Sequence, residues 1–330
     1  MNVSVEPNSA KAAALAARYG AEAMPAAGPW NDTMAVLLDH RSIRGYLPDP
    51  LPPGTLQSLI AAAQSAATSS NMQTWSVIVV MDPEKKKALA QIANNQKHIE
   101  DCPLFLVFLA DLSRLDRMAA AEGIAFQGLP YAETFLVAAI DAALAAQNAV
   151  IAAESLGLAT VYIGALRNDV EAVAHVLGLP KGAAGVFGLC VGHADPKAAA
   201  EVKPRLPQQA IVHFDSYVVP DETSLRAAYD ARLAAFSQRN EMAHQTWTER
   251  VIARLAQTKA LNGRDRLRAA LGALPVEQRE AFLLREEAGM SLQEIGEATG
   301  TGRETAKSRL RYAVERLRRA LDEGDERSRP

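Results

Sequence analysis

The 330-residue sequence has few cysteines, few aromatic side chains and no long apolar run. Its two cysteines, Cys102 and Cys190, lie far apart and belong to no CxxC or Cys/His cluster. Neither a disulfide framework nor a zinc site is therefore predicted, and both residues are expected to be unreactive core thiols in a reducing, cytoplasmic compartment. No stretch reaches the roughly 18 uninterrupted apolar residues that favour a transmembrane helix, so we expect no membrane span.

The charge shows little bias, because 35 basic residues face 38 acidic ones. A formal net charge of -3 gives no indication of nucleic-acid binding for the chain as a whole, although charge can still segregate locally. A hydrophobic content of 49% and a charged content of 22% predict a folded protein. The Ala-rich N-terminal stretch lacks the basic start and apolar core of a secretory signal, so we interpret residues 1–30 as a tail or an accessory helix.

Helix-like and strand-like patterns alternate along most of the chain, which is typical of a layered α+β fold with a mixed sheet flanked by helices. An Ala-rich helix at residues 131–156 is predicted to run through the core or a dimer interface, and Tyr131 either begins this helix or lies near a bound substrate. Beyond Glu222 we predict only helices. The earlier helices are predicted at residues 53–67, 83–94 and 169–177, and the strands at 77–80, 104–109, 160–163 and 185–191.

The run His40-Arg41-Ser42-Ile43-Arg44 combines two guanidinium groups, an imidazole and a hydroxyl, and it comes after a short helix capped within residues 31–33. Such a run is either a solvated helix end or an anion site. A flavin mononucleotide would need arginines at its phosphate, Ser and Asn along its ribityl chain and close backbone groups at its ring. Lys203 and Arg205, the polar residues 69–73 and the segment 162–166, where Gly164 permits close approach, offer these groups.

In this order along the chain, the motifs closely resemble those of oxygen-insensitive nitroreductases and NADPH-flavin oxidoreductases of the nitroreductase superfamily, from about residue 32 to residue 265. The matching motifs are HRSIRGY (40–46), SSNMQTW (69–75), QKHIEDCPLFLVFLAD (96–111), VYIGALRN (161–168), FGLCVGHADP (187–196) and VKPRLP (202–207).

This resemblance implies a homodimer that holds FMN noncovalently at the subunit interface. It also implies ping-pong chemistry, in which NADPH or NADH gives hydride to the flavin N5 and a small flat acceptor (a nitroaromatic, a quinone or a flavin) then takes two electrons. No acid/base pair is required, since the cofactor carries the chemistry. Carried over by motif, the FMN-binding residues would be His40, Arg41, Ser42, Arg44, Lys203 and Arg205 at the phosphate and ribityl chain, Ser69, Ser70, Asn71 and Gln73 on one side of the flavin, and Ile163, Gly164 and Leu166 at its ring.

The resemblance leaves the choice between NADPH and NADH open. Relatives that prefer NADPH tend to carry a basic cluster ahead of a Thr-Trp pair, where the 2′-phosphate is held. Ahead of Thr246-Trp247 this chain has Arg239 and His244 as candidates, opposed by Glu241. The other histidines show no ligand spacing, so no metal site is predicted; they are His98, His175, His193 and His213.

After about residue 266 the pattern changes to short helices joined by a Gly-containing turn, which is a helix-turn-helix pattern. Ser291 and Glu294 form a capping box, and residues 303–321 carry seven basic and two acidic side chains around a buried apolar stripe. Alone, such a basic helix is either a solvated face or a surface for phosphates.

The stretch 274–321 closely resembles region 4 of extracytoplasmic-function sigma factors, which contacts promoter DNA and RNA polymerase. We therefore predict an FMN-binding reductase domain at 31–265, a region 4-like domain at 266–322 and a disordered tail at 323–330. The alternative to a reductase with an appendage is a flavin-linked transcriptional regulator that binds DNA. The candidate DNA contacts are Arg303, Glu304, Thr305, Lys307, Ser308 and Arg311, with phosphate contacts dominating the affinity.

Overall fold

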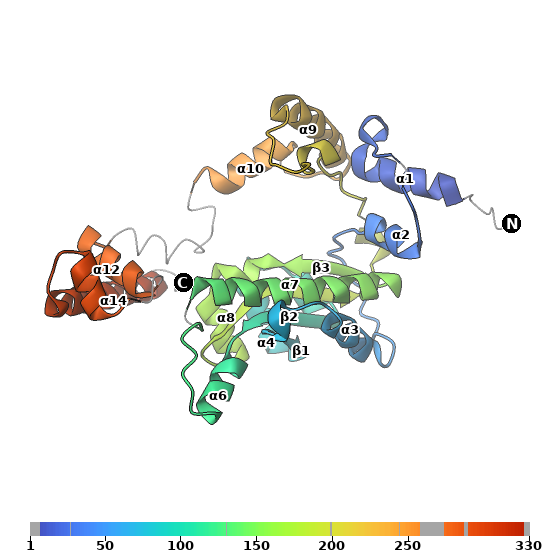
Figure 1. Cartoon of the computed structure of the whole chain (residues 1–330). Coiled ribbons are helices and arrows are strands. Elements are labelled where there is room, and N and C mark those ends of the chain that lie inside the picture. The colour runs from blue at the N-terminus through green and yellow to red at the C-terminus, as the bar shows by residue number, and fades with distance from the viewer. Residues whose placement is uncertain are drawn as a thin grey trace.

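A four-stranded sheet with helices on both faces forms the centre of the reductase part of the chain (Figure 1). The computed structural model describes residues 7–26, 28–129, 131–198, 200–243, 245–257, 274–286 and 290–326. The strand order is β1-β2-β4-β3, and the four predicted strands are confirmed. They are β1 (Trp75–Val80), β2 (Leu104–Asp111), β3 (Ala159–Ile163) and β4 (Ala183–Gly192).

The predicted helices are also present, with ends that differ by a few residues. The helices of the reductase part are α1 (Pro7–Tyr19), α2 (Asp32–Asp39), α3 (Thr55–Gln64), α4 (Pro83–Ile92), α5 (His98–Asp101), α6 (Ser113–Ala121), α7 (Ala132–Ser155), α8 (Val170–Leu177), α9 (Glu222–Arg239) and α10 (Trp247–Leu255). Short 3-10 turns lie at Ala21–Ala23, Ser69–Asn71, Gly164–Asn168, Pro196–Ala198 and Gln208–Ala210.

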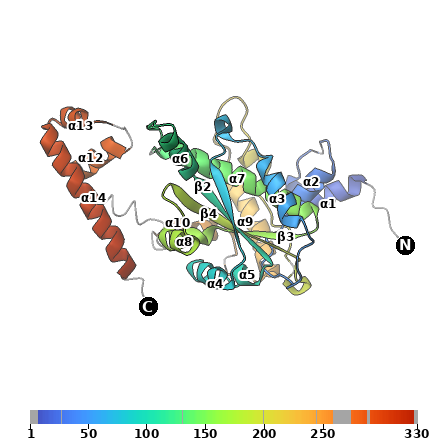
Figure 2. The same ribbon diagram turned by 90° about the horizontal axis from the view of Figure 1, so that it is seen from below.

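The named strands pair antiparallel, and β2 is buried along its whole length between β1 and β4. A parallel bridge between Ser42 and Thr160 adds the segment after α2 beside β3, which makes the pairing mixed. Helices α3 and α7 cover one face of the sheet, while α4, α5 and α8 cover the other. Figure 2 shows these two layers from below. The predicted α+β fold is therefore confirmed.

Helix α7 is 24 residues long and mostly apolar. By length and composition alone it could cross a membrane. However, its alanines pack against α3 and the sheet, among them Ala142, Ala145, Ala146 and Ala149, which are fully buried. Small side chains permit this close packing. The helix is therefore a core helix of the reductase domain.

The N-terminal region contains a described helix, α1, which resolves the choice between a tail and an accessory helix for residues 7–19. Helix α1 contacts α2, and the left-handed Gly20 ends it near Arg232 of α9. Helices α9 and α10 share a separate apolar cluster centred on Tyr229, Leu233 and Phe236.

The C-terminal part forms a three-helix unit of α12 (Val276–Glu286), α13 (Leu292–Ala298) and α14 (Arg303–Glu326). Figure 2 shows α12 and α13 beside the first half of α14, and two small apolar clusters join the three helices. The predicted capping box of Ser291 and Glu294 is present. The prediction of a disordered tail from residue 323 was wrong for residues 323–326, where α14 continues because no proline lies between Arg303 and Pro330 to stop it.

Candidate flavin site

The predicted anion-binding run begins where α2 ends at Asp39 and the chain turns along the sheet edge. The Ile43 amide donates to the Thr160 carbonyl at 3.0 Å, and the buried Tyr46 hydroxyl donates to the Ile43 carbonyl at 2.9 Å. Gly45 packs so tightly that an added Cβ would lie 2.2 Å from the Ala198 Cβ, which excludes any side chain there. The run is therefore a fixed edge segment and more than a solvated helix end.

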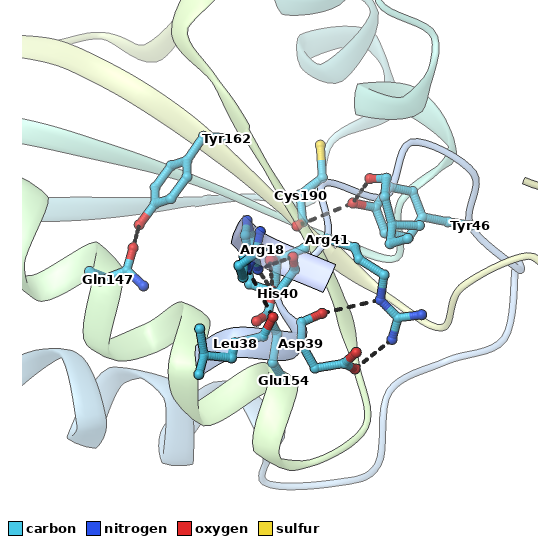
Figure 3. Close-up of polar contacts among 12 residues, drawn as sticks. Arg18, Leu38, Asp39, His40, Arg41, Tyr46, Gln147, Glu154, Tyr162 and Cys190 are labelled. Carbon is cyan, nitrogen blue, oxygen red and sulfur yellow. Dashed lines mark hydrogen bonds and ion pairs between the residues drawn. The ribbon is translucent and has the colours of Figure 1, made fainter. Parts of the chain in front are cut away.

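His40 is oriented by a carboxylate from α7. Its Nδ1 lies 2.7 Å from Oε1 of Glu154, and the same oxygen accepts a hydrogen bond from the Thr160 hydroxyl at 2.7 Å (Figure 3). One glutamate thus links the end of α7, the start of β3 and the predicted anion-binding run. Sequence reasoning did not identify Glu154, because only the folded chain brings it to His40.

A pocket of about 220 Å³ joins the run to the second predicted basic segment. Burial lowers the pKa of Lys203 below its ordinary value, and the positive charges of Arg44, Arg250 and Arg205 lower it further. Such crowding of like charge favours an anionic ligand. We call this the cationic pocket; it is lined by His40, Arg41, Ser42, Arg44, Ala200, Glu201, Lys203, Arg205, Phe236, Asn240 and Met242.

Two of the predicted phosphate ligands are engaged elsewhere. The exposed Arg41 pairs with Asp39 through Nη2 and Oδ2 at 2.8 Å (Figure 3). Arg205 donates from Nη1 to the Lys203 and Pro204 carbonyls at 3.1 and 3.2 Å. These contacts are surface ion pairs and local hydrogen bonds, which are weak enough to exchange for a phosphate.

The second predicted cluster is a loop, residues 69–74, held by a buried carboxylate of α7. Asp141 is 1% exposed; its carboxylate accepts hydrogen bonds from the Ser69 and Thr74 amides, each at 3.2 Å, and from the Thr74 hydroxyl at 2.8 Å. Between these anchors, Ser70, Asn71 and Gln73 adopt left-handed backbone conformations with φ of 49°, 55° and 52°. Such conformations are costly for these residues, so the surrounding hydrogen bonds must hold the loop in shape.

A second network supports the same loop from β1 and α6. Arg114 donates to the Gln73 carbonyl at 2.9 Å and to the Ser76 hydroxyl at 3.1 Å. Although burial raises the pKa of Asp111, hydrogen bonds from Ser113 and Ser76 bring it below its ordinary value. Asn71, Gln73, Ser76 and Arg114 line one pocket of about 470 Å³. Sequence reasoning missed both Asp141 and Arg114.

Comparison with known proteins settles the family. Residues 37–193 match the nitroreductase family, and residues 203–274 match its C-terminal domain. The FMN reductase (NADPH) of Bacillus subtilis is 40% identical over 227 residues, which cover 67% of this chain and 90% of that protein. The chain belongs to the nitroreductase family.

Two further relatives of this nitroreductase support the assignment. An oxygen-insensitive NADPH nitroreductase of Salmonella typhimurium is 38% identical over 222 residues, or 66% of this chain and 89% of that protein. The structure of B. megaterium NfrA1 is 41% identical and aligns with a TM-score of 0.66 over 70% of this chain and 95% of that one. Residues 264–317 match sigma-70 region 4, overlapping the reductase match. Both predicted resemblances are confirmed.

The predicted ring contacts of the nitroreductase lie where β3 ends. Ile163 is the last residue of β3, and Gly164 opens the 3-10 turn that includes Leu166. The side chains of Ile163 and Leu166 are buried in the core, and the contact of their main-chain groups with a flavin ring stays a prediction.

The predicted nicotinamide-phosphate residues have different outcomes. Arg239 forms an ion pair with Glu201, from Nη2 to Oε2, at 2.8 Å, on the rim of the cationic pocket. His244 lies outside the described residues. In the part of the chain that the structure describes, no group of three or more His, Cys, Asp or Glu residues could hold a metal ion.

The predicted DNA contacts lie on the first turns of α14. Arg303, Lys307 and Arg311 are exposed, and the guanidinium of Arg311 stacks over the Tyr312 ring at 4.9 Å. Ala306 and Ala313 of the same helix are fully buried. Of the other predicted contacts, Glu304 and Thr305 are exposed and Ser308 is half-buried.

Proposed function

We propose that this chain is an FMN-dependent NAD(P)H oxidoreductase that passes two electrons to nitroaromatics, quinones or flavins. The observation that carries the proposal is the cationic pocket, where Arg44 and Arg205 crowd the partly buried Lys203. Positive charges held this close repel one another. The FMN phosphate, a dianion with several acceptor oxygens, relieves that repulsion and matches the donors present.

The loop of residues 69–74, which we call the polar loop, lies in a different part of the same protomer from the cationic pocket. The cationic pocket and the pocket at residues 69–76 have no lining residue in common. Their anchors on α7, Glu154 and Asp141, are thirteen residues apart, which corresponds to about 20 Å along the helix axis. This separation supports a site completed across two protomers, with the phosphate on one and the polar loop contributed by the other.

Exposed apolar surface supports a homodimer. Four large side chains of α7 are about half exposed, and the segment after residue 210 carries others, of which Phe214 is 83% exposed. Large apolar side chains left exposed in such numbers favour a protein partner. These residues are Phe135, Leu136, Ile140 and Leu144 on α7, and Ile211, Val212, Phe214, Tyr217, Val218 and Val219 after it.

The two-electron chemistry would come from bound FMN, which accepts hydride from NAD(P)H and returns it to the acceptor. The protein residues bind and orient. Glu154 fixes the imidazole of His40, Asp141 fixes the polar loop, and the cations of the pocket hold the phosphate. The two free, buried cysteines fit a reducing cytoplasm.

A flavin titration tests the proposal. Purified protein should carry, or take up, FMN with a flavin absorption spectrum that bleaches anaerobically on adding NADPH or NADH, and recovers on adding a quinone or nitroaromatic. Rates with each nicotinamide decide the preference. Arg239→Ala should raise KM for NADPH more than for NADH if Arg239 leaves Glu201 to hold the 2′-phosphate. Protein that takes up no FMN would overturn the reductase assignment.

A second function is supported by the C-terminal unit. Its exposed Arg303, Lys307 and Arg311 lie on one helix whose apolar residues pack inward, which is the arrangement of a helix that binds nucleic-acid phosphates. We propose that this region 4-like unit binds duplex DNA. A flavin-linked regulator additionally requires that oxidised and reduced protein differ in DNA affinity.

Salt titration of DNA binding tests this second function. Replacing Arg303, Lys307 and Arg311 with Ala should weaken binding and reduce the log-log salt slope by about 0.9 for each phosphate that the variant no longer neutralises. As a control, Ala replacements of the exposed Lys85, Lys87 and Lys97 remove the same charge from the reductase domain. Equal effects of both triple variants would reject α14 as the DNA-binding surface.

A further inference from the structure

The N-terminal helix α1 inserts one arginine directly behind the cationic pocket. Arg18, in the last turn of α1, is only 4% exposed. Figure 3 shows its guanidinium beside Leu38 and His40. Helix α1 precedes residue 37, where the match to the nitroreductase family begins, so neither the family match nor the site motifs include Arg18.

The guanidinium of Arg18 donates to three carbonyl groups from two separate segments. Nε donates to Leu38 at 3.0 Å and Nη2 to His40 at 2.6 Å, while Nη1 donates to Lys203 at 3.0 Å. In return, the Arg205 amide donates to the Arg18 carbonyl at 2.8 Å. One side chain therefore ties the start of the anion-binding run to the second basic segment, whose Lys203 lies 185 residues after Arg18 in the chain.

The charges near Arg18 explain why such a tie is needed. The two segments carry Arg44, Lys203 and Arg205, which repel one another, as the lowered pKa of Lys203 reflects. Burial also lowers the pKa of Arg18, and the positive charge of Arg205 lowers it further. Because a guanidinium keeps its proton and offers five donors in a fixed plane, it can hold three carbonyls at once under this repulsion.

We propose that Arg18 is a positioning residue for the phosphate end of the flavin site: it clamps the two basic segments at the spacing that a phosphate requires. This inference rests on the proposed function and adds to it a residue from outside the family's matched region. Arg18 uses its donors on carbonyls, so it acts through the position of Lys203 and the run that begins at His40. Its three side-chain hydrogen bonds go to carbonyl groups at the phosphate end.

The same helix offers a matched control. Lys11 is also buried, at 9% exposure, and donates from Nζ to the Gly28 carbonyl while lying over the Trp30 ring at 6.0 Å. It attaches α1 to the chain that leads into α2 and touches neither basic segment in these contacts. Lys11→Met therefore loosens α1 by loss of one buried cation without opening the clamp.

Comparing FMN with riboflavin, which lacks the phosphate, tests the clamp. Apoprotein of the wild type, Arg18→Met and Lys11→Met should be titrated with each flavin by fluorescence quenching. We expect Arg18→Met to weaken FMN binding by about 10- to 100-fold, the range for a loss of about 1.4–2.8 kcal/mol, and to leave riboflavin binding within about threefold. Lys11→Met should change neither affinity by more than about threefold.

The outcomes separate the clamp from the reductase proposal. Wild-type protein that binds no FMN would refute the proposed function itself. Wild-type protein that binds FMN, with Arg18→Met binding it equally well, would overturn the clamp alone. Equal losses for FMN and riboflavin would also overturn it, since they would show a general structural role.

A conservative variant covers the case in which Arg18→Met does not fold. Arg18→Lys keeps the buried charge but replaces the planar donors with one ammonium, so it should fold and lose FMN affinity by about three- to tenfold with riboflavin unaffected. Unchanged FMN affinity in Arg18→Lys, with a circular-dichroism spectrum like that of the wild type, would show that the fixed planar geometry is not used.

Discussion

The cationic pocket and the polar loop, the two ends of the proposed flavin site, each contact a carboxylate of α7. Repulsion between cations dominates in the pocket, whereas satisfied hydrogen bonds dominate in the loop. At the cationic pocket, Glu154 orients one imidazole while the neighbouring cations repel one another. At the polar loop, Asp141 accepts three hydrogen bonds and leaves its anchors satisfied. The pocket therefore loses stability to its charges until an anion binds, whereas the loop contributes to the stability of the fold. The first arrangement favours binding and the second maintains shape.

The largest expected effect tests the loop end. Asp141→Ala leaves the Ser69 amide and the buried amide and hydroxyl of Thr74 without their acceptor, so the free energy of unfolding should fall by about 3 kcal/mol, and FMN affinity should fall with it. Urea unfolding and a flavin titration measure the two quantities. Gln147→Ala, at an exposed position of α7, removes only the acceptor of a 3.3 Å hydrogen bond from the Tyr162 hydroxyl and should cost no more than about 1 kcal/mol. Retained stability in Asp141→Ala would show that the loop holds its shape by other contacts.

The next largest effect tests the cationic pocket, where FMN affinity should change without a fall in the free energy of unfolding. The ammonium of Lys203 lies over the Phe236 ring at 5.9 Å, and Lys203→Met keeps an unbranched side chain at this position but removes a repelled charge. We expect FMN to bind about 10- to 100-fold more weakly while the stability of the apoprotein does not fall, since a charge-assisted hydrogen bond to phosphate is removed but no buried group is stranded. If FMN affinity and apoprotein stability both fell, as in Asp141→Ala, the cationic pocket would not differ from the polar loop in this respect.

The stability of the apoprotein should also depend on pH through the repelled charge of Lys203, with a smaller effect. The folded pKa of Lys203 lies below its ordinary value of 10.5, so between these two values the unfolded chain holds more protons than the folded one. The Lys203 contribution to the free energy of unfolding therefore rises with pH through that window. FMN binding needs the charged ammonium and should weaken over the same window. Both trends should be smaller in Lys203→Met, measured by urea unfolding and flavin titration at a series of pH values.

The smallest effect concerns the orientation of His40. Glu154→Gln keeps an acceptor for the imidazole and for the Thr160 hydroxyl but removes the negative charge, so FMN affinity should change by no more than about threefold. Glu154→Ala removes the acceptor as well and should weaken FMN binding further. Identical affinities of the two variants would show that His40 does not depend on this contact.

Most helices and strands could be predicted from the sequence because each depends on residues that are neighbours in the chain. Short apolar runs and helical spacing located the four strands and most helices, and the capping box at Ser291 and Glu294 marked the start of α13. Helix α6 was not predicted, since its nine residues contain only two large apolar side chains, Leu115 and Met118. The basic runs at residues 40–44 and 203–205 were recognisable because cations cluster there in the sequence itself.

The contacts that shape the site could not be predicted in this way. Arg18, Asp141 and Glu154 lie in helices, where a single charged residue carries no distinctive local signal. Each becomes informative only when folding brings it to a partner, as Arg18 meets the Lys203 carbonyl and Asp141 the Thr74 amide. Their roles depend on burial, which strengthens a satisfied hydrogen bond and penalises an unsatisfied one.

The sequence by itself thus determined the two structural units, the order of the elements and the chemical character of the ligand, because hydrophobic period and charge are properties of the chain. Only the tertiary structure decided how the segments of the proposed binding site are held together. It joined residues 40–44 to residues 203–205 through Arg18, and it anchored the polar loop to α7 at a different point from the cationic pocket. The physical reason is that these contacts join segments up to 185 residues apart, and only close packing of the folded chain fixes such distances.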